Sequence, residues 1–136
     1  MVNPEHPFFA PGTVTAPYWE GLARGELLYQ KCSACGHAQL PPRAQCTGCL
    51  GDSLTWQRSS GRGHIVSWVV YRQAIHERFK AKVPYNVAIV ETEEGARMIT
   101  NIVGVENAAL RIGLPVTLAI EEEDGLALAR FRPGTP

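Results

Sequence analysis

The chain has 136 residues, of which 45% are hydrophobic and 19% are charged, and its 13 basic side chains balance its 13 acidic ones. This length suits one compact domain or two small ones, and it is too short for a Rossmann or (β/α)8-barrel enzyme. The composition is that of a globular protein. A formal net charge of zero excludes the dominant basic field that a dedicated duplex-DNA binder needs.

The sequence also bears on the cellular compartment. No apolar run approaches the ~18 residues that a membrane-spanning helix requires. Residues 1–17 contain four prolines and no basic residue ahead of an apolar run, so they do not have the pattern of an export signal. We expect an irregular leader, or the end of a linker from a larger chain. The chain is therefore expected in the cytoplasm, where reducing conditions favour metal binding by cysteines over disulfides.

The first predicted element is a short helix over residues 17–24. Pro17 stands near its start and Gly25 near its end, the positions that these residue types favour. Trp19, Leu22 and Ala23 fall at helical spacing, so they should share one apolar stripe of the helix.

After a short strand predicted over residues 26–31, two C-x-x-C pairs follow with ten residues between them: Cys32, Cys35, Cys46 and Cys49. Two residues between thiolates let both sulfurs of a pair reach one ion, and Gly36 and Gly48 ease the backbone turns. Together the pairs give the closed S4 set of a structural zinc site, with no open position for water or substrate. Iron in a rubredoxin-like site has the same ligands, and a redox dithiol is a further alternative that lacks its usual βαβ context.

From Trp56 onward the sequence is typical of strands. We predict five of them, over residues 64–72, 85–92, 96–103, 116–122 and 126–131. Acidic residues followed by Gly95 and by Gly125 predict two hairpin turns. Residues 106–111 predict a helical turn. This order of elements indicates a small five-stranded barrel of the OB type, with an SH3-like barrel as the alternative.

The predicted protein is thus mainly β and has three sections. Residues 1–31 hold the leader, the short helix and the first strand; residues 32–55 form a rubredoxin-like zinc ribbon; residues 56–136 form the OB-fold domain. Because the ribbon has few apolar residues, we expect it to fold only with metal bound and against its neighbours.

The sequence contains no familiar catalytic pattern. The G-x-S-x-G, Walker, G-x-G-x-x-G and H-E-x-x-H motifs are missing. With the cysteines assigned to metal, no thiol nucleophile remains. The acidic residues at 93–94 and 121–124 fall in predicted turns and are interpreted as solvated. The sequence places no partner beside His64 or His76. We therefore predict no catalytic residues in this chain.

The connection between the first two predicted barrel strands is basic. From Arg62 to Lys82 the sequence has five basic residues and a single acid, Glu77. In OB barrels this connection is one of the ligand-facing loops, so it could hold a nucleotide phosphate, single-stranded nucleic acid or an acidic partner. A solvated loop with its aromatic side chain packed on the barrel is the alternative. The candidate binding residues are Arg72, Arg78, Phe79, Lys80 and Lys82.

Motifs spread over about residues 17–133 resemble a family of zinc-ribbon and OB-fold proteins found beside thiolase-like enzymes. The order of the motifs is specific, although Tyr18 replaces a more usual Phe and Thr47 stands where Pro is often found. They are Tyr18-Trp19, Gly25-Glu26-Leu27, Cys32-x-x-Cys35-Gly36, Pro41-Pro42-Arg43, Cys46-x-x-Cys49, Trp56, Gly61-x-Gly63, Pro84-Tyr85, Ala88-x-Val90-Glu91, Ile112-Gly113-x-Pro115-Val116 and Phe131-Arg132-Pro133.

The resemblance implies a non-catalytic accessory subunit, or domain, that binds a thiolase-superfamily subunit and helps to form its acyl-CoA channel. The partner would supply the catalytic residues for thiolysis, Claisen condensation, acyl transfer or retro-aldol cleavage of CoA thioesters, as in degradation of steroid side chains or aromatic compounds. The phosphates of CoA would give Arg78, Lys80 and Lys82 a use. Exposed apolar residues near Trp19 and Leu22 are the partner-docking candidates.

Two other functions stay open at this point. A single-stranded nucleic-acid-binding OB-fold protein is the main alternative, since zinc ribbons and OB barrels both occur in that class. Balanced charge and an aromatic content of 8% argue against it. A stand-alone electron-transfer protein is the other, and colour together with iron content would support it. No membrane partner is expected.

Overall fold

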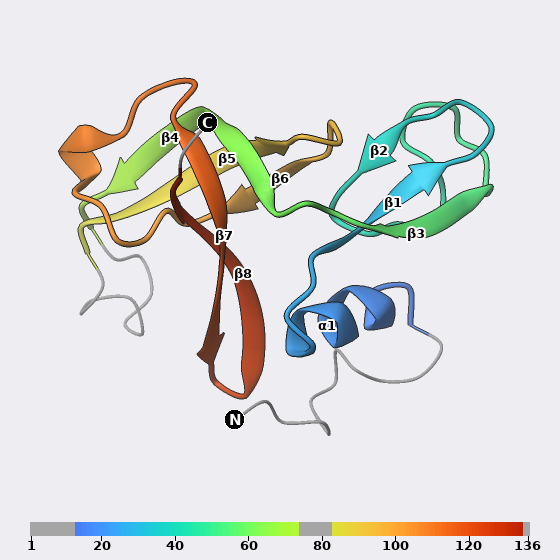
Figure 1. The fold of residues 1–136 in the computed structure, drawn as a ribbon, viewed down its shortest axis with the longest axis horizontal. Helices are drawn as coiled ribbons and strands as arrows, with labels where there is room; N and C mark the ends of the chain where they lie inside the picture. Colours follow the sequence, from blue (N-terminus) through green and yellow to red (C-terminus); the bar gives the residue numbers. More distant parts are fainter. Residues whose placement is uncertain (1–12, 74–82, 135–136) are drawn as a thin grey trace.

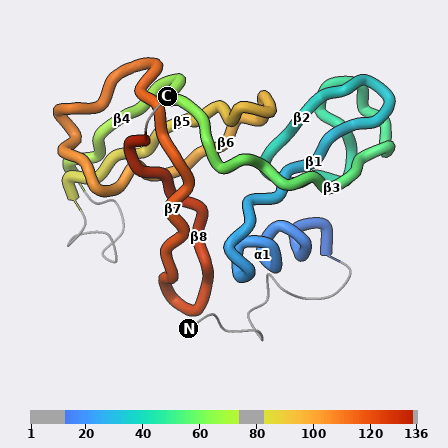
Figure 2. The backbone as a smooth tube through the Cα atoms, viewed as in Figure 1, coloured from blue at the N-terminus to red at the C-terminus, as the bar shows by residue number. Residues whose placement is uncertain are grey.

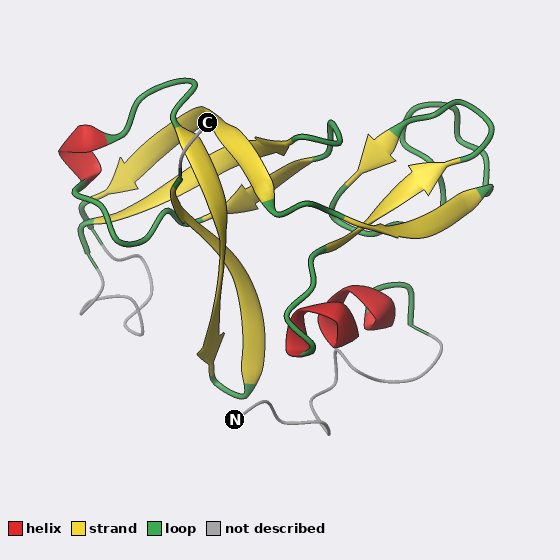
Figure 3. Ribbon diagram, viewed as in Figure 1, coloured by secondary structure: helices red, strands yellow, loops and turns green. Residues whose placement is uncertain are grey.

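The computed structural model describes residues 13–73 and 83–134. Strands dominate this part of the chain (Figure 3), which confirms the mainly β prediction. No helix in it is long and apolar enough to cross a membrane. The elements in chain order are α1 (Ala16–Ala23), β1 (Leu28–Cys32), β2 (Ala38–Gln39), β3 (Leu54–Arg58), β4 (Arg62–Tyr71), β5 (Tyr85–Thr92), β6 (Arg97–Thr100), the 3-10 turn η3 (Asn107–Ala109), β7 (Pro115–Glu123) and β8 (Leu126–Pro133).

Helix α1 ends where its sequence predicts. Gly25 has a φ of 88°, a left-handed conformation that glycine adopts without strain. The N–H of Gly25 donates to the carbonyl of Leu22 at 3.0 Å, and the N–H of Glu26 donates to Gly21 at 2.8 Å. This pair of bonds is a Schellman motif, which satisfies the last helical carbonyls. The turn directs the chain from α1 into β1, and α1 contacts both β1 and β8 (Figure 1).

The ribbon is built on a three-stranded antiparallel sheet in the order β2-β1-β3. Its middle strand is β1, which the sequence analysis assigned to the section before the ribbon. In this sheet Gln30 of β1 pairs with Gln39 of β2 on one side and with Trp56 of β3 on the other. The sheet therefore extends beyond residues 32–55 in both directions, because a C-x-x-C spacing marks the metal loops and not the strands that carry them.

The second sheet is the predicted OB barrel, with strand order β6-β5-β4-β7-β8. Strand β4 is shared, pairing with β5 along most of its length and with β7 at its start. The sheet curls until Ile102, just after β6, forms a parallel bridge with Phe131 of β8. The N–H of Val103 donates to Phe131 at 2.8 Å, and the N–H of Phe131 donates to Asn101 at 3.1 Å. These bonds close the barrel.

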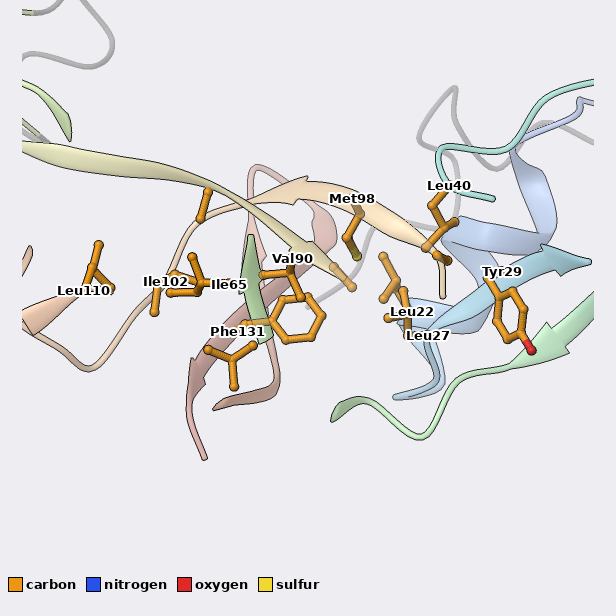
Figure 4. Packing of buried hydrophobic residues seen from close by; sticks show 14 residues of the cluster. Leu22, Leu27, Tyr29, Leu40, Ile65, Val90, Met98, Ile102, Leu110 and Phe131 are labelled. Atoms are coloured by element: carbon orange, nitrogen blue, oxygen red, sulfur yellow. The ribbon is translucent and has the colours of Figure 1, made fainter. Parts of the chain in front are cut away.

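One core joins all three sections. Inside the barrel it contains Ile65, Val90 and Phe131, and from there it continues through Met98 to Leu22 and Leu27 (Figure 4). Leu40 and Tyr29 extend the same core into the ribbon. The chain passes from ribbon to barrel between β3 and β4 (Figure 2). The shared core therefore fixes the ribbon against the barrel in addition to that single connection.

Candidate metal centre and the surfaces around it

The four cysteines converge on one point between the two ribbon loops. Their sulfurs all lie within 4.8 Å of one another, with 3.7 Å between Cys32 and Cys49 and 3.6 Å between Cys35 and Cys46. A disulfide needs about 2.05 Å. Tetrahedral zinc with bonds of about 2.3 Å separates its sulfur ligands by about 3.8 Å. The spacing of the sulfurs therefore fits a shared metal ion and does not fit disulfides.

The two metal loops repeat one backbone pattern. The N–H of Gly36 donates to the carbonyl of Cys32 at 2.8 Å, and the N–H of Leu50 donates to that of Cys46 at 2.8 Å. Gly36 has a φ of 80° and Leu50 a φ of 65°. A leucine thus occupies the left-handed position in the second loop. Gly48 has another role, because a Cβ there would lie 3.2 Å from the side chain of His37.

Backbone N–H groups shift the thiol pKa values. Those of Cys49 and Gly48, at 3.5 and 3.3 Å, lower the pKa of Cys46 to about 7. The N–H of His37 favours the thiolate of Cys35, but hydrogen bonds with Cys46 and burial outweigh it and raise the pKa of Cys35 to about 12. Four adjacent thiolates repel one another unless a cation neutralises them. A divalent metal would allow all four to ionise, so the donor set fits zinc.

Two buried glutamines hold the second metal loop on the sheet. Gln39 donates to the side-chain oxygen of Gln30 at 2.9 Å and accepts from the N–H of Thr47 at 2.8 Å. Gln30 accepts from the N–H of Arg43 at 2.8 Å and donates to its carbonyl at 2.9 Å. Both glutamines are 4% exposed. Neither glutamine is among the predicted site residues, although polar residues in a strand that leads to a metal loop are a usable signal for such support.

The predicted docking residues lie on α1. Trp19 is half-buried and packs edge-on against Tyr18, with ring centroids 5.1 Å apart. Leu22 is 1% exposed and belongs to the core. The prediction that Leu22 faces a partner is therefore wrong, because the apolar stripe of α1 is used to dock the helix on its own chain.

Of the predicted basic candidates, Arg72 is described and is exposed just after β4. Arg78, Phe79, Lys80 and Lys82 lie outside the described residues. His37 is exposed and contacts Thr47 Oγ1 at 2.9 Å through Nε2, separate from the four sulfurs.

The prediction that the acidic turns are merely solvated is wrong, because their carboxylates have partners in the fold. Glu94 accepts hydrogen bonds from Ser59 Oγ at 2.6 Å and from the N–H of Ser60 at 2.9 Å. Glu93 pairs with Arg62 at 2.8 Å. These bonds tie the β5–β6 turn to the segment that links ribbon and barrel. The turn therefore helps to set how the two parts are oriented.

On the β7–β8 hairpin, Glu121 and Glu123 both bind Arg130 at 2.7 Å. Arg130 and Glu123 line a cavity of about 330 Å³ together with Asn86 and Asn107. Since two carboxylates already neutralise Arg130, this cavity does not offer an anion a free positive charge.

Comparison with known proteins identifies the family. Residues 19–55 match the family model described as ChsH2, rubredoxin-like zinc ribbon domain, and residues 56–121 match ChsH2, C-terminal OB-fold domain. A DUF35 domain-containing scaffold protein of Methanothermobacter thermautotrophicus is 36% identical over 132 residues, which cover 90% of this chain and 98% of that protein. The chain belongs to the DUF35 family. The resemblance noted in the sequence is thereby confirmed.

Two further relatives of this DUF35 protein carry names from enzyme complexes. The solved structure of the Ltp2-ChsH2(DUF35) aldolase contains a chain that matches with a TM-score of 0.76 and 33% identity, covering 91% of this chain and 98% of that one. A "probable enoyl-CoA hydratase alpha subunit" of Thermomonospora curvata is 35% identical over 122 residues. Those residues cover 88% of this chain but only 37% of that protein.

Proposed function

We propose that this DUF35 protein is a non-catalytic accessory subunit that binds a thiolase-superfamily enzyme and helps to form its acyl-CoA channel. The observation that carries the proposal is the closed metal centre. Four cysteines from two loops would occupy every position of a tetrahedral ion, so the metal would hold the ribbon together and would have no free position for substrate. Relatives of the same fold are named as a scaffold protein and as parts of a hydratase and an aldolase.

The described histidines support a non-catalytic role. His37 is held by Thr47, and the ring of His64 lies 3.7 Å from the carboxylate of Glu91 on the exposed outside of the barrel. A general base needs a reacting group within hydrogen-bond reach and a site that excludes water. Neither histidine has such surroundings.

In this proposal the partner supplies the nucleophile and base for making or breaking carbon–carbon bonds in CoA thioesters. The OB domain contributes one wall of the channel. Arg78, Lys80 and Lys82 remain the candidates for the CoA phosphates, and Arg72 lies at the start of the same basic connection. Trp19 remains a candidate partner contact. The complex is expected to act in the cytoplasm.

Co-expression with a thiolase-superfamily protein from the same organism tests this function. We expect the two chains to elute together in size-exclusion chromatography and to turn over CoA thioesters faster together than either does alone. Separate elution with no gain in activity would contradict the proposal. Binding of single-stranded oligonucleotides that weakens steeply with salt would instead favour the nucleic-acid alternative.

A further inference from the structure

The outward face of the sheet formed by β4, β5 and β6 is largely apolar, with exposed Ser67 of β4, which pairs with Ile89, as a polar position within it. Val69, Tyr71 and Ile99 are 55%, 41% and 73% exposed. Between them Tyr85, Val87 and Ile89 of β5 are half-buried, and they alternate with the buried residues that face the core. We call these six side chains the outer face.

The strand register places the members of the outer face side by side. Ile89 pairs with Ile99 across β5 and β6, and Val69 pairs with Val87 across β4 and β5. In the next row Tyr71 and Tyr85 stack, with ring centroids 5.3 Å apart and an interplanar angle of 24°. The six side chains therefore form one continuous patch.

Such a patch is unusual on the outside of a barrel. An antiparallel sheet with one face in the core normally alternates apolar residues inward with polar residues outward. Here the outward positions of β5 are apolar as far as Glu91, where a polar row of Arg97, Glu91 and His64 begins. An exposed, β-branched face next to the edge strand β6 would promote aggregation if it stayed uncovered. The outer face is therefore best explained as a surface that another molecule covers.

The dimensions of the outer face favour a protein as the occupant. It extends about 13 Å along β5 and about 10 Å across three strands, from the usual spacings of a sheet. Among the described residues it is a sheet surface, and cavities adjoin it only at two of its members: Tyr85 also lines the cavity of about 330 Å³, and Ile99 lines one of about 150 Å³ with Tyr18 and Leu40. A stable protein interface covers about 800 Å² on each partner, with an apolar centre and a polar rim. The outer face would form the apolar centre of such an interface, and its two tyrosines are of the residue type that anchors interfaces.

We propose that the outer face docks against an apolar patch on the catalytic partner subunit. This inference rests on the proposed function, since it names the surface through which the accessory subunit binds. The rim of the face includes exposed Arg72 at one end and Arg97 at the other. Arg97 shares Glu91 with His64, so the described rim has a basic excess. The matching rim of the partner should carry acidic side chains. A second copy of this chain would present the same basic rim and fits less well.

A pair of matched variants tests the proposal. Ile99 in the outer face and Ile112 in the loop before β7 are both 73% exposed, so aspartate at either position should leave the fold intact. The binding constant of each variant for the purified thiolase-superfamily subunit is measured, and a thermal melt verifies folding. We expect Ile99→Asp to weaken binding by at least about tenfold. Ile112→Asp should stay within about twofold of the wild type.

The possible outcomes separate this proposal from the proposed function. If the wild type and both variants bind equally, the outer face is not the docking surface and the accessory role stands. Equal weakening by both variants would also overturn the assignment, because the effect would not be specific to this face. If the wild-type chain binds no such subunit, both proposals fail. If it forms a dimer alone that Ile99→Asp dissociates, the face joins two copies of this chain and the heteromeric proposal is wrong.

Discussion

The side chain of Gln39 donates a hydrogen bond of 2.9 Å to the side chain of Gln30, and this buried pair holds the second metal loop against the ribbon sheet. Through it the backbone of Arg43 and of Thr47 is tied to the ribbon sheet. The position of Cys46, one residue before Thr47, therefore depends on two side chains that do not touch the metal.

Replacing Gln39 by alanine should weaken both folding and metal retention. The change leaves the N–H of Thr47 without its acceptor and removes one hydrogen bond of Gln30, which keeps its two bonds to Arg43. We expect a loss of about 2–3 kcal/mol in the free energy of unfolding. The measurement is urea unfolding together with the rate of zinc transfer to a chelator. Gln57→Ala, on an exposed position of β3, is the control and should behave as the wild type. Equal chelation rates for Gln39→Ala and wild type would show that the pair does not support the metal loop.

Removal of the metal should unfold the ribbon and loosen the barrel. Structural zinc contributes folding free energy directly, and Leu40 of the ribbon belongs to the same core as Met98 of the barrel. Cys46→Ser should reduce the metal content from one zinc per chain toward zero and lower the melting temperature of the whole chain. Ser33→Ala, an exposed change beside Cys32, is the matched control. Colourless protein with one zinc is expected; a red protein containing iron would contradict the zinc assignment.

The free energy of unfolding should fall at acidic pH because Glu93 and Glu94 in the β5–β6 turn become protonated. Hydrogen bonds from Arg62 and then from Ser60 lower the pKa of Glu93. Burial opposes the effect at Glu94, but hydrogen bonds from Ser59 and Ser60 outweigh it and lower the pKa of that carboxyl. The stability that these carboxylates contribute is therefore present above their unfolded pKa of about 4.3 and is lost as the pH falls through their lower folded values.

The double variant Glu93→Gln, Glu94→Gln tests this pH dependence. It should be less stable than the wild type at pH 7, and the difference should shrink as the pH is lowered to about 3. Denaturant unfolding at a series of pH values measures it. Glu20→Gln, on the exposed side of α1, should follow the wild type throughout. If the difference in stability between wild type and double variant stays constant over this pH range, the two carboxylates are not the cause of the pH dependence.

Leu22→Ala should destabilise the chain whether or not a partner is present. A fully buried leucine truncated to alanine costs about 2–5 kcal/mol through lost burial and the remaining cavity. Leu22 is 1% exposed, whereas Ala23 beside it is exposed, so Ala23→Ser is the control. Thermal melts of the isolated chain measure the effect. An unchanged melting temperature with weaker partner binding would restore Leu22 as a docking residue.

Local signals in the sequence predicted much of the fold. The turn at Asp124 and Gly125 is a two-residue hairpin in which both residues have positive φ, as an acidic residue followed by glycine predicts. Strand β5 has the predicted bounds, Tyr85–Thr92. The cysteine spacing predicted all four residues that converge on the candidate metal site. Each of these features depends on residues close together in the chain.

Features that depend on distant contacts were missed or misjudged. Glu94 looked solvated because Ser59, its partner, lies 35 positions earlier. Gln30 and Gln39 looked like ordinary polar strand residues because their support for the metal loop appears only once the strands pair. Leu22 was predicted to contact a partner because the pattern of a helix shows which face is apolar and does not show whether the same chain covers that face.

The most direct measurement of the central claim is native mass spectrometry of this chain co-expressed with a thiolase-superfamily subunit of its own organism. We expect an assembly that contains both chains and one zinc for each copy of the DUF35 protein. Detection of this chain only by itself, with the catalytic subunit fully assembled and active without it, would contradict the accessory role.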